Sequence, residues 1–217
     1  VLARCSPASV IGVDPSSGFI DYAIARISDA RGSFQVGDAQ ALPVDDASVD
    51  VVVSALMLNF VPDRAAGLAE MRRVVTRGGL VAAYVWDYPG EMRLLKVFWD
   101  TAIELDPQAA KAAESVVFDF CRPEPLRELF AGAGLRDVEV QAIDVPTDFR
   151  NFDDYWTPFL SGQAPAPAYA MSLDEAGRVR LRESLRDRLP ADADGSIHLT
   201  ARAWAVWGSS RYPSGVS

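Results

Sequence analysis

The sequence predicts an α/β fold, a three-layer sandwich whose sheet is mainly parallel. Short apolar runs alternate with helical patterns in the first half of the chain, and the later strand candidates alternate polar and apolar residues. Continuous apolar strands are typical of parallel sheets covered on both faces, whereas alternating strands are typical of half-exposed antiparallel pairs. We therefore expect residues 136–145 and 197–207 to form an antiparallel pair. Every second residue from Ile197 to Trp207 is apolar and is expected to lie on one face.

The first half of the chain contains predicted strands separated by helices. The strands are SVIGV, SFQVGD, VDVVVSA and LVAAYVW, and the last two are expected to be buried on both faces. The segment SGFIDYAIARI predicts a helix whose N-cap is Ser16 or Ser17. Apolar residues recur at helical spacing in RAAGLAEMRRVVTRGG, so we expect a second helix there with Gly78 as its C-cap.

The second half is predicted to contain helices at EMRLLKVFWDTAIEL and PEPLRELFAGAG, and an insertion before the last strand. We expect residues 1–217 to form a single domain with a core at 1–146 and 191–217. The insertion, at 147–190, opens with the aromatic-rich DFRNFDDYWTPFL and closes with an arginine-rich helix. Insertions near strand ends commonly shape substrate pockets, so this one is expected to cap the substrate.

The composition limits the classes of partner. The chain has 217 residues with 21 Lys and Arg against 30 Asp and Glu, a net charge of −9, so nucleic acid and anionic membranes are unfavourable partners. Cys5 and Cys121 have no paired spacing, and neither a metal site nor a disulfide framework is expected. No signal peptide is visible, and the longest apolar stretch, VVVSALML, is too short to span a bilayer. A cytoplasmic enzyme or binding module is therefore expected.

Two aspartates follow neighbouring strands of the predicted sheet. A carboxylate at the end of a strand can accept hydrogen bonds from both hydroxyls of a ribose, and Asp14 is placed for that role. Asp38 follows the next strand, where a carboxylate can accept a hydrogen bond from the amine of an adenine while the Ala39 amide contacts the ring edge. The alternative for Asp14 is a structural role as a helix N-cap or in a turn, and for Asp38 a structural role in a turn.

These segments resemble the class I S-adenosylmethionine-dependent methyltransferases, particularly the ubiquinone and menaquinone biosynthesis branch with a methyltransferase type 11 domain. The resemblance rests on VIGVDPSSGFIDYA, VGDAQALPVDDASVDVVVSALMLNFVPD, EMRRVVTRGGLVAAYVW and GSIHLTARAWAVWG. It implies a Rossmann-like fold and S-adenosyl-L-methionine as cofactor. It also implies three groups of cofactor contacts: Asp14, Pro15 and Ser16 at the ribose, Asp38 and Ala39 at the adenine, and Ser54, Ala55 and Leu56 at the methionine end.

The first strand of the family and its glycine-rich loop have no counterpart in the sequence as given. The opening residues, VLARCSPA, resemble the end of the helix that follows that loop. In the family, this strand separates the strands that here end at Asp14 and Ser54. We expect a segment upstream, direct pairing of these two strands, or another chain in the slot, because unpaired inner strand edges are costly. The chain as given is expected to bind the cofactor weakly or not at all.

Methyl transfer from a sulfonium needs little from the protein beyond alignment and exclusion of water, because the cofactor supplies the reactivity. Many relatives carry histidine where this chain has Asn59, which can orient a nucleophile but cannot take its proton. His198 is expected to be an exposed or hydrogen-bonded structural residue. The acceptor is expected to be small or medium-sized and partly apolar. Aromatic residues are the candidates for its pocket, although each is more often a core residue: Trp86, Tyr88, Tyr155 and Trp156.

Alternatives from other classes remain open at this stage. An NAD(P)-dependent oxidoreductase would also place an acid after its second strand, but Tyr-x-x-x-Lys, typical of short-chain dehydrogenases, does not occur. A catalytically inactive remnant that acts as a binding or oligomerisation module is a second alternative, and the sequence leaves a homodimer open. The arginines of the last predicted helix alternate with acids, which indicates a solvated face and not a nucleic-acid patch.

Overall fold

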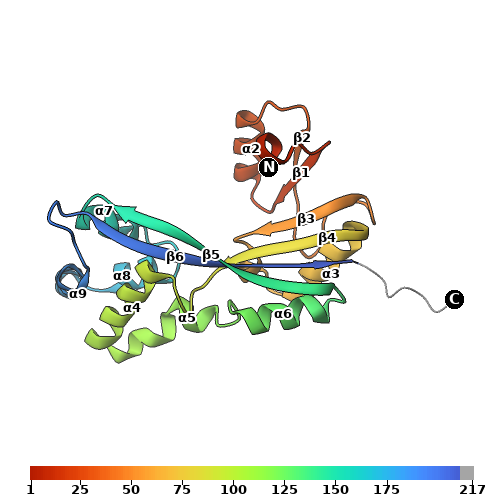
Figure 1. Ribbon diagram of the computed structural model, residues 1–217. Helices are drawn as coiled ribbons and strands as arrows, with labels where there is room; N and C mark the ends of the chain where they lie inside the picture. Colours follow the sequence, from red (N-terminus) through yellow and green to blue (C-terminus); the bar gives the residue numbers. More distant parts are fainter. Residues whose placement is uncertain (211–217) are drawn as a thin grey trace. The chain divides into compact units, whose positions relative to one another are not determined.

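The computed structural model describes residues 1–210, which are divided between two compact units. Unit 1 consists of Val1–Ala83, Arg127–Glu139 and the described part of Trp207–Ser217, and unit 2 consists of Tyr84–Leu126 and Val140–Val206. The fold is α/β with two sheets, a two-stranded sheet of order β1-β2 and a four-stranded sheet of order β3-β4-β6-β5 (Figure 1). The prediction of an α/β fold is confirmed, but two separate sheets replace the single sheet that was expected.

The elements follow one another along the chain as α1 (Leu2–Cys5), β1 (Val10–Asp14), α2 (Ser17–Arg26), β2 (Gly32–Val36), β3 (Val49–Ala55), η1 (Leu58–Phe60), α3 (Arg64–Val74), β4 (Val75–Trp86), α4 (Arg93–Leu105), η2 (Pro107–Ala112), α5 (Glu114–Val117), α6 (Pro123–Gly132), β5 (Arg136–Phe149), α7 (Phe152–Trp156), η3 (Thr157–Leu160), α8 (Pro165–Ser172), α9 (Glu175–Arg188) and β6 (Ile197–Ser209). Within residues 1–210, no helix combines the length and apolar composition needed to cross a bilayer.

The strands β1 and β2 are parallel and are joined by α2, the arrangement that a right-handed β-α-β connection produces. Ser16 is the N-cap of α2, and its hydroxyl accepts a hydrogen bond from the Phe19 amide at 3.4 Å. Gly12 lets β1 lie close to the Phe34 ring of β2, since a Cβ at this position would lie 2.7 Å from Phe34 Cδ1. The sequence therefore predicted this module correctly.

The four-stranded sheet is mixed. The crossover through α3 brings β3 and β4 together, and the Ala47 and Ser48 amides donate to successive carbonyls at the end of α3. Side chains join β5 and β6 at Asp148–His198 and Asp144–Arg202, so residue numbers rise along one strand as they fall along the other. This is the antiparallel relation predicted for the two segments, and the arrows of β5 and β6 show it in Figure 1.

The prediction that β3 is buried on both faces is wrong. The side chains of Val51 and Val53 are 53% and 55% exposed, whereas Ser54 is buried. In the described chain, β3 pairs only with β4 and β1 pairs only with β2, so the expected alternative in which β1 and β3 pair directly is not found. The reason for the exposure is that no described element covers this face of β3, even though its valine-rich sequence suits burial.

Two smaller predictions also fail. The helix α3 ends at Val74 because the chain turns directly into β4, so Gly78 lies within β4 and is not a helix C-cap. In β6, Val206 and Gly208 are buried while Ala205 and Trp207 are half-buried, so the expected single apolar face does not continue to Trp207. A one-residue change in alternation moves all later side chains to the opposite face.

The core of unit 2 is aromatic and joins α4 to the predicted insertion. Phe98 of α4 stacks on Phe159 with ring centroids 4.6 Å apart and an interplanar angle of 12°. The carboxylate of Glu114 is buried in this core, where it accepts hydrogen bonds from Trp99 Nε1 and from the Ala166 amide. Residues 147–190 therefore share one core with α4, and their role as a substrate cap stays a prediction. The buried core residues are Phe98, Trp99, Ala102, Ala109, Ala113, Tyr155, Trp156, Phe159, Ala166, Ala170, Leu181, Leu185, Leu189 and Ile197.

Candidate functional site

Asp14 and Asp38 lie at the same end of the β1-β2 sheet. Asp14 is the last residue of β1 and lies opposite Val36, the last residue of β2. The Gly37 amide donates to the Asp14 carbonyl at 3.1 Å, which holds the two strand ends together, and Asp38 follows immediately. The parallel register thus brings the two carboxylates that the sequence singled out to one edge of unit 1.

Both carboxylates also stabilise the turns in which they lie. Asp14 Oδ1 accepts a hydrogen bond from the Ser16 amide at 2.8 Å, and Asp38 Oδ1 accepts one from the Gln40 amide at 2.8 Å. Within residues 1–210, Asp14 Oδ2 has no hydrogen bond, and Asp38 Oδ2 has only a long contact of 3.5 Å with Gln40 Nε2. A structural role therefore uses one oxygen of each carboxylate and leaves the other able to accept from a ligand.

The segment that follows Asp38 is attached to α3. The Leu42 amide donates to Glu70 Oε2 at 2.8 Å, and the Arg73 guanidinium donates to the carbonyls of Leu42 and Val44, both at 2.9 Å. The same guanidinium binds Glu70 and holds the pKa of that carboxyl below its usual range. Arg73 is thus a positioning residue for the loop that carries Asp38.

We expect Arg73→Ala to free this loop from α3, because its carbonyls lose their donors and Glu70 loses its counter-ion. Hydrogen exchange at residues 42–46 should become faster, while exchange within β1 stays unchanged. Arg4→Ala, which removes an exposed arginine of the same unit, is the matched control. Unchanged exchange at residues 42–46 in the Arg73 variant would contradict the positioning role.

Two polar side chains near the end of β3 are buried without partners. Ser54 Oγ and Asn59 Nδ2 have no hydrogen-bond partner in the described chain, although both side chains are only 4% exposed. An unsatisfied buried polar group costs about 1–3 kcal/mol, so both atoms have hydrogen-bonding capacity to offer a ligand or a water. Leu56, between them, has a φ of 53°, a left-handed conformation that is rare for a branched side chain and marks a sharp turn.

The remaining cofactor candidates are less informative. Pro15 and Ala55 are exposed and Ala39 is half-buried. Each comes directly after a residue described above: Pro15 after Asp14, Ala39 after Asp38 and Ala55 after Ser54. All the residues predicted to bind the cofactor, together with Asn59, belong to unit 1. Their roles toward a cofactor stay predictions.

The acceptor candidates belong to unit 2, and two of them are core residues. Tyr155 is buried, its hydroxyl donates to the Leu94 carbonyl at 2.9 Å, and burial raises the pKa of that hydroxyl above its usual value. Trp156 is buried in the same core. Trp86 and Tyr88 are half-buried. Packing accounts for the burial of Tyr155 and Trp156, and their contact with an acceptor stays a prediction.

A pocket in unit 2 adjoins the loop around Tyr88, which was predicted to lie on the acceptor side, but its charged lining was not predicted from the sequence. Its volume is about 450 Å³, within the range of small-molecule sites, and it adjoins the loop that follows β4. The sequence signal for this lining is Asp87, an acid directly after a predicted strand. The pocket is lined by Asp87, Pro89, Gly90, Ser115 and Arg122.

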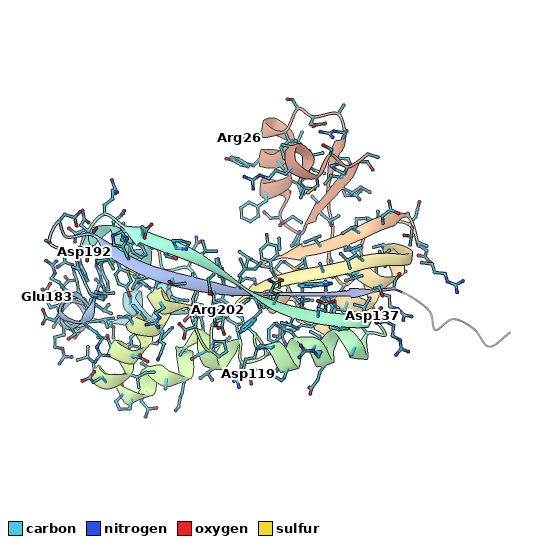
Figure 2. The ribbon with its side chains drawn as sticks, viewed as in Figure 1. Arg26, Asp119, Asp137, Glu183, Asp192 and Arg202 are labelled. Carbon is cyan, nitrogen blue, oxygen red and sulfur yellow. The ribbon has the colours of Figure 1, made fainter. Side chains whose placement is uncertain are left out.

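His198 lies in an exposed polar cluster on β5 and β6. Its Nδ1 lies 2.8 Å from Asp148 Oδ1 and its Nε2 lies 3.2 Å from Ser196 Oγ, distances that also occur in a serine nucleophile site. However, Ser196 Oγ donates to Asp194 at 2.6 Å, and Asp148 raises the pKa of His198, with Asp192 and Asp194 adding to the effect. Asp192 is labelled in Figure 2. Because Ser196 Oγ already donates its proton to Asp194, the cluster holds no serine hydroxyl for the imidazole to activate, and His198 is exposed and hydrogen-bonded as the sequence predicted.

The pKa of His198 can be measured directly because it is the single histidine of the chain. We expect its imidazole to titrate above the ordinary value of about 6.5, and Asp148→Asn to lower that pKa because the negative hydrogen-bond partner is lost. Imidazole proton shifts followed by NMR across neutral pH provide the measurement. If the pKa of His198 is the same in the Asp148→Asn variant and in the parent, the ion pair does not form in solution.

Comparison with known proteins shows which proteins the chain is similar to. Residues 1–83 match the family model described as "Methyltransferase domain". A demethylmenaquinone methyltransferase of Roseiflexus castenholzii is 30% identical over 143 residues, which are 61% of this chain and 60% of that protein. A ubiquinone/menaquinone biosynthesis C-methyltransferase of Geobacter sulfurreducens is 26% identical over 152 residues, 63% of this chain and 59% of that protein.

The chain therefore spans about 60% of the length of the curated relatives that it matches. Among solved structures, a proposed methyltransferase from Bacillus halodurans has a TM-score of 0.56 at 14% identity, with 94% of this chain and 84% of that chain covered. This likeness concerns the fold alone. The match over residues 1–83 and the similarity to these relatives confirm the resemblance to class I S-adenosylmethionine-dependent methyltransferases that the sequence indicated.

Proposed function

We propose that the chain binds S-adenosyl-L-methionine and transfers its methyl group to a small or medium-sized, partly apolar acceptor. The observation that carries this proposal is the pair of carboxylates, Asp14 and Asp38, on neighbouring parallel strand ends with one oxygen of each left to accept. Acids at successive strand ends of an α/β sheet suit the hydroxyls and the base of a nucleoside.

The residues of unit 1 fit this cofactor in chemical type. Asp14 would accept hydrogen bonds from the ribose hydroxyls, and Asp38 from the adenine amine, beside the Ala39 amide. Ser54 Oγ and Asn59 Nδ2, buried without partners, would bind polar groups at the methionine end. Each of these contacts uses an atom whose hydrogen-bonding capacity the described chain leaves unused.

When bound, the cofactor supplies a methyl group on a sulfonium, a centre that reacts with nucleophiles directly. The chain's own contribution would be alignment and exclusion of water. Asn59 can donate a hydrogen bond that orients an acceptor, but it cannot take a proton at neutral pH. His198 is engaged by Asp148, so neither residue is proposed as a general base.

The acceptor itself is open to test. The relatives compared above are named for quinone biosynthesis, which favours an acceptor with an apolar ring.

We further propose that the complete fold is the three-layer sandwich of the family, with a further strand between β1 and β3. The free edges of these two strands and the exposed Val51 and Val53 support this.

Thermal melting with added nucleotide separates the candidate functions. S-adenosylhomocysteine should raise the melting temperature of the chain more than NAD at equal concentration, because binding to the folded state stabilises it. A larger shift with NAD would instead favour an oxidoreductase. Because the chain as given is expected to bind the cofactor weakly, both ligands are compared at millimolar concentration, and a shift with neither would favour the inactive module.

A further inference from the structure

The pocket beside the loop that follows β4 has the charges of a binding site. A buried acid, Asp87, and an exposed base, Arg122, line the same cavity of about 450 Å³, with Ser115 as a neutral hydrogen-bonding group. All of the lining residues belong to unit 2, so the cavity is formed within one compact unit. Its volume suits a small organic molecule.

Asp87 is the unusual member of this pocket. It is only 5% exposed, and its Oδ2 accepts a hydrogen bond from the Glu91 amide at 2.9 Å. In the described chain, no arginine, lysine or histidine forms an ion pair with it. The charge of Asp87 acts on Arg202 through space, but the Arg202 guanidinium binds Asp144 at 2.7 and 3.0 Å. Arg202 is labelled in Figure 2. A nearly buried carboxylate without an ion-pair partner favours a bound cation.

Gly90 keeps this carboxylate in place. A Cβ at position 90 would lie 2.5 Å from Asp87 Oδ2 and 2.8 Å from Oδ1, closer than packed atoms allow. Any other residue would therefore push the carboxylate out of its present position. The loop thus combines a buried acid with the one residue type that leaves room for it.

Arg122 supplies the opposite charge. Its side chain is exposed, and within residues 1–210 its guanidinium makes neither an ion pair nor a hydrogen bond. A guanidinium presents paired N–H donors that match the two oxygens of a carboxylate. The half-buried hydroxyl of Ser115 can add a further donor.

We propose that this pocket binds a small zwitterion, with its ammonium group at Asp87 and its carboxylate at Arg122 and Ser115. The proposal goes beyond methyl transfer and does not depend on cofactor binding. The two charges of opposite sign in one cavity favour a molecule that carries both over a simple cation or anion.

The test uses a series of unbranched ω-amino acids, from glycine to 6-aminohexanoate, measured by ligand-observed NMR without cofactor. One length should bind best, and it should bind better than the alkylamine and the alkylcarboxylate of equal length. Arg122→Gln and Asp87→Asn should each weaken that binding about tenfold or more, because each removes a charge-assisted hydrogen bond. Arg180→Gln, which neutralises an exposed arginine elsewhere in unit 2, should leave it unchanged.

Thermal melts of the variants separate loss of binding from loss of folding. Arg122 is exposed, and within residues 1–210 its side chain forms no hydrogen bond or ion pair, so Arg122→Gln should melt as the parent does. Gly90→Ala should also weaken binding, since it displaces the Asp87 carboxylate. Three results would overturn the proposal. The alkylcarboxylate could bind as well as the ω-amino acid of equal length, no ω-amino acid could bind at millimolar concentration, or binding could persist in both Arg122→Gln and Asp87→Asn.

Discussion

Glu114→Ala is expected to destabilise unit 2 more than any other single substitution considered. The carboxylate is 3% exposed and accepts hydrogen bonds from Trp99 Nε1 on α4 and from the Ala166 amide on α8. Removing it leaves both donors buried without an acceptor, at a cost of about 1–3 kcal/mol for each in the free energy of unfolding. Urea denaturation followed by tryptophan fluorescence provides the measurement.

The exposed Asp119, labelled in Figure 2, is the control, since Asp119→Ala removes a carboxylate of the same unit without a buried donor. Burial raises the pKa of Glu114, so the folded state binds the proton more tightly than the unfolded state does. The stability that this group contributes is therefore greatest at low pH and falls as the pH rises through the folded-state pKa. Glu114→Gln should remove this pH dependence, and a parallel pH profile of both proteins would contradict the assignment.

Asp14→Ala is expected to have the largest effect on cofactor binding. The variant loses charge-assisted hydrogen bonds to the two ribose hydroxyls, each worth about 1.5–3 kcal/mol at most. Asp38→Ala should cost less, because a single hydrogen bond is lost at a more exposed edge. Thermal melting of each variant without ligand shows whether a loss of affinity for S-adenosylhomocysteine comes from a loss of folding, and each variant should melt as the parent does.

Asp21→Ala is the matched control for this comparison. Asp21 is exposed on α2, in the same unit, and does not belong to the ends of β1 or β2. Affinity should fall in the order parent and Asp21→Ala, then Asp38→Ala, then Asp14→Ala. Equal affinity of the Asp14 variant and the parent would show that this carboxylate serves the turn to Ser16 and nothing more.

Local features of unit 1 could be predicted from the sequence because they depend on neighbouring residues. The strand ending at Asp14, the Ser16 cap and the strand ending at Val36 follow from apolar runs and capping chemistry. The register that brings Asp38 beside Asp14 follows from the parallel connection through α2.

Features that depend on distant contacts could not be predicted in the same way. A valine-rich strand is expected to be buried, but the side chains of Val51 and Val53 are exposed. Burial depends on which elements cover the strand, and that cannot be predicted from the strand's own residues. The predicted insertion shares its core with α4, so its deletion would expose Phe98. Deletion therefore cannot separate acceptor binding from folding, and single substitutions are the better test.

The pocket was missed for a related reason. Its lining comes from the loop after β4, from α5 and from Arg122, the residue directly before α6, so no single stretch of sequence carries it. Tyr155 and Trp156, predicted as acceptor contacts, pack in the core. In a folded protein, large apolar side chains are more often core than ligand contacts.

The central claim is that the strand ends of β1 and β2 bind the nucleoside of S-adenosylmethionine. Titration of the ¹⁵N-labelled chain with S-adenosylhomocysteine, followed by amide shifts, tests it most directly, because NMR detects weak as well as tight binding. The account predicts that the largest shifts fall on residues 14–18 and 38–41, and that Asp14→Ala abolishes them. Shifts confined to other residues, or equal shifts with NAD, would contradict it.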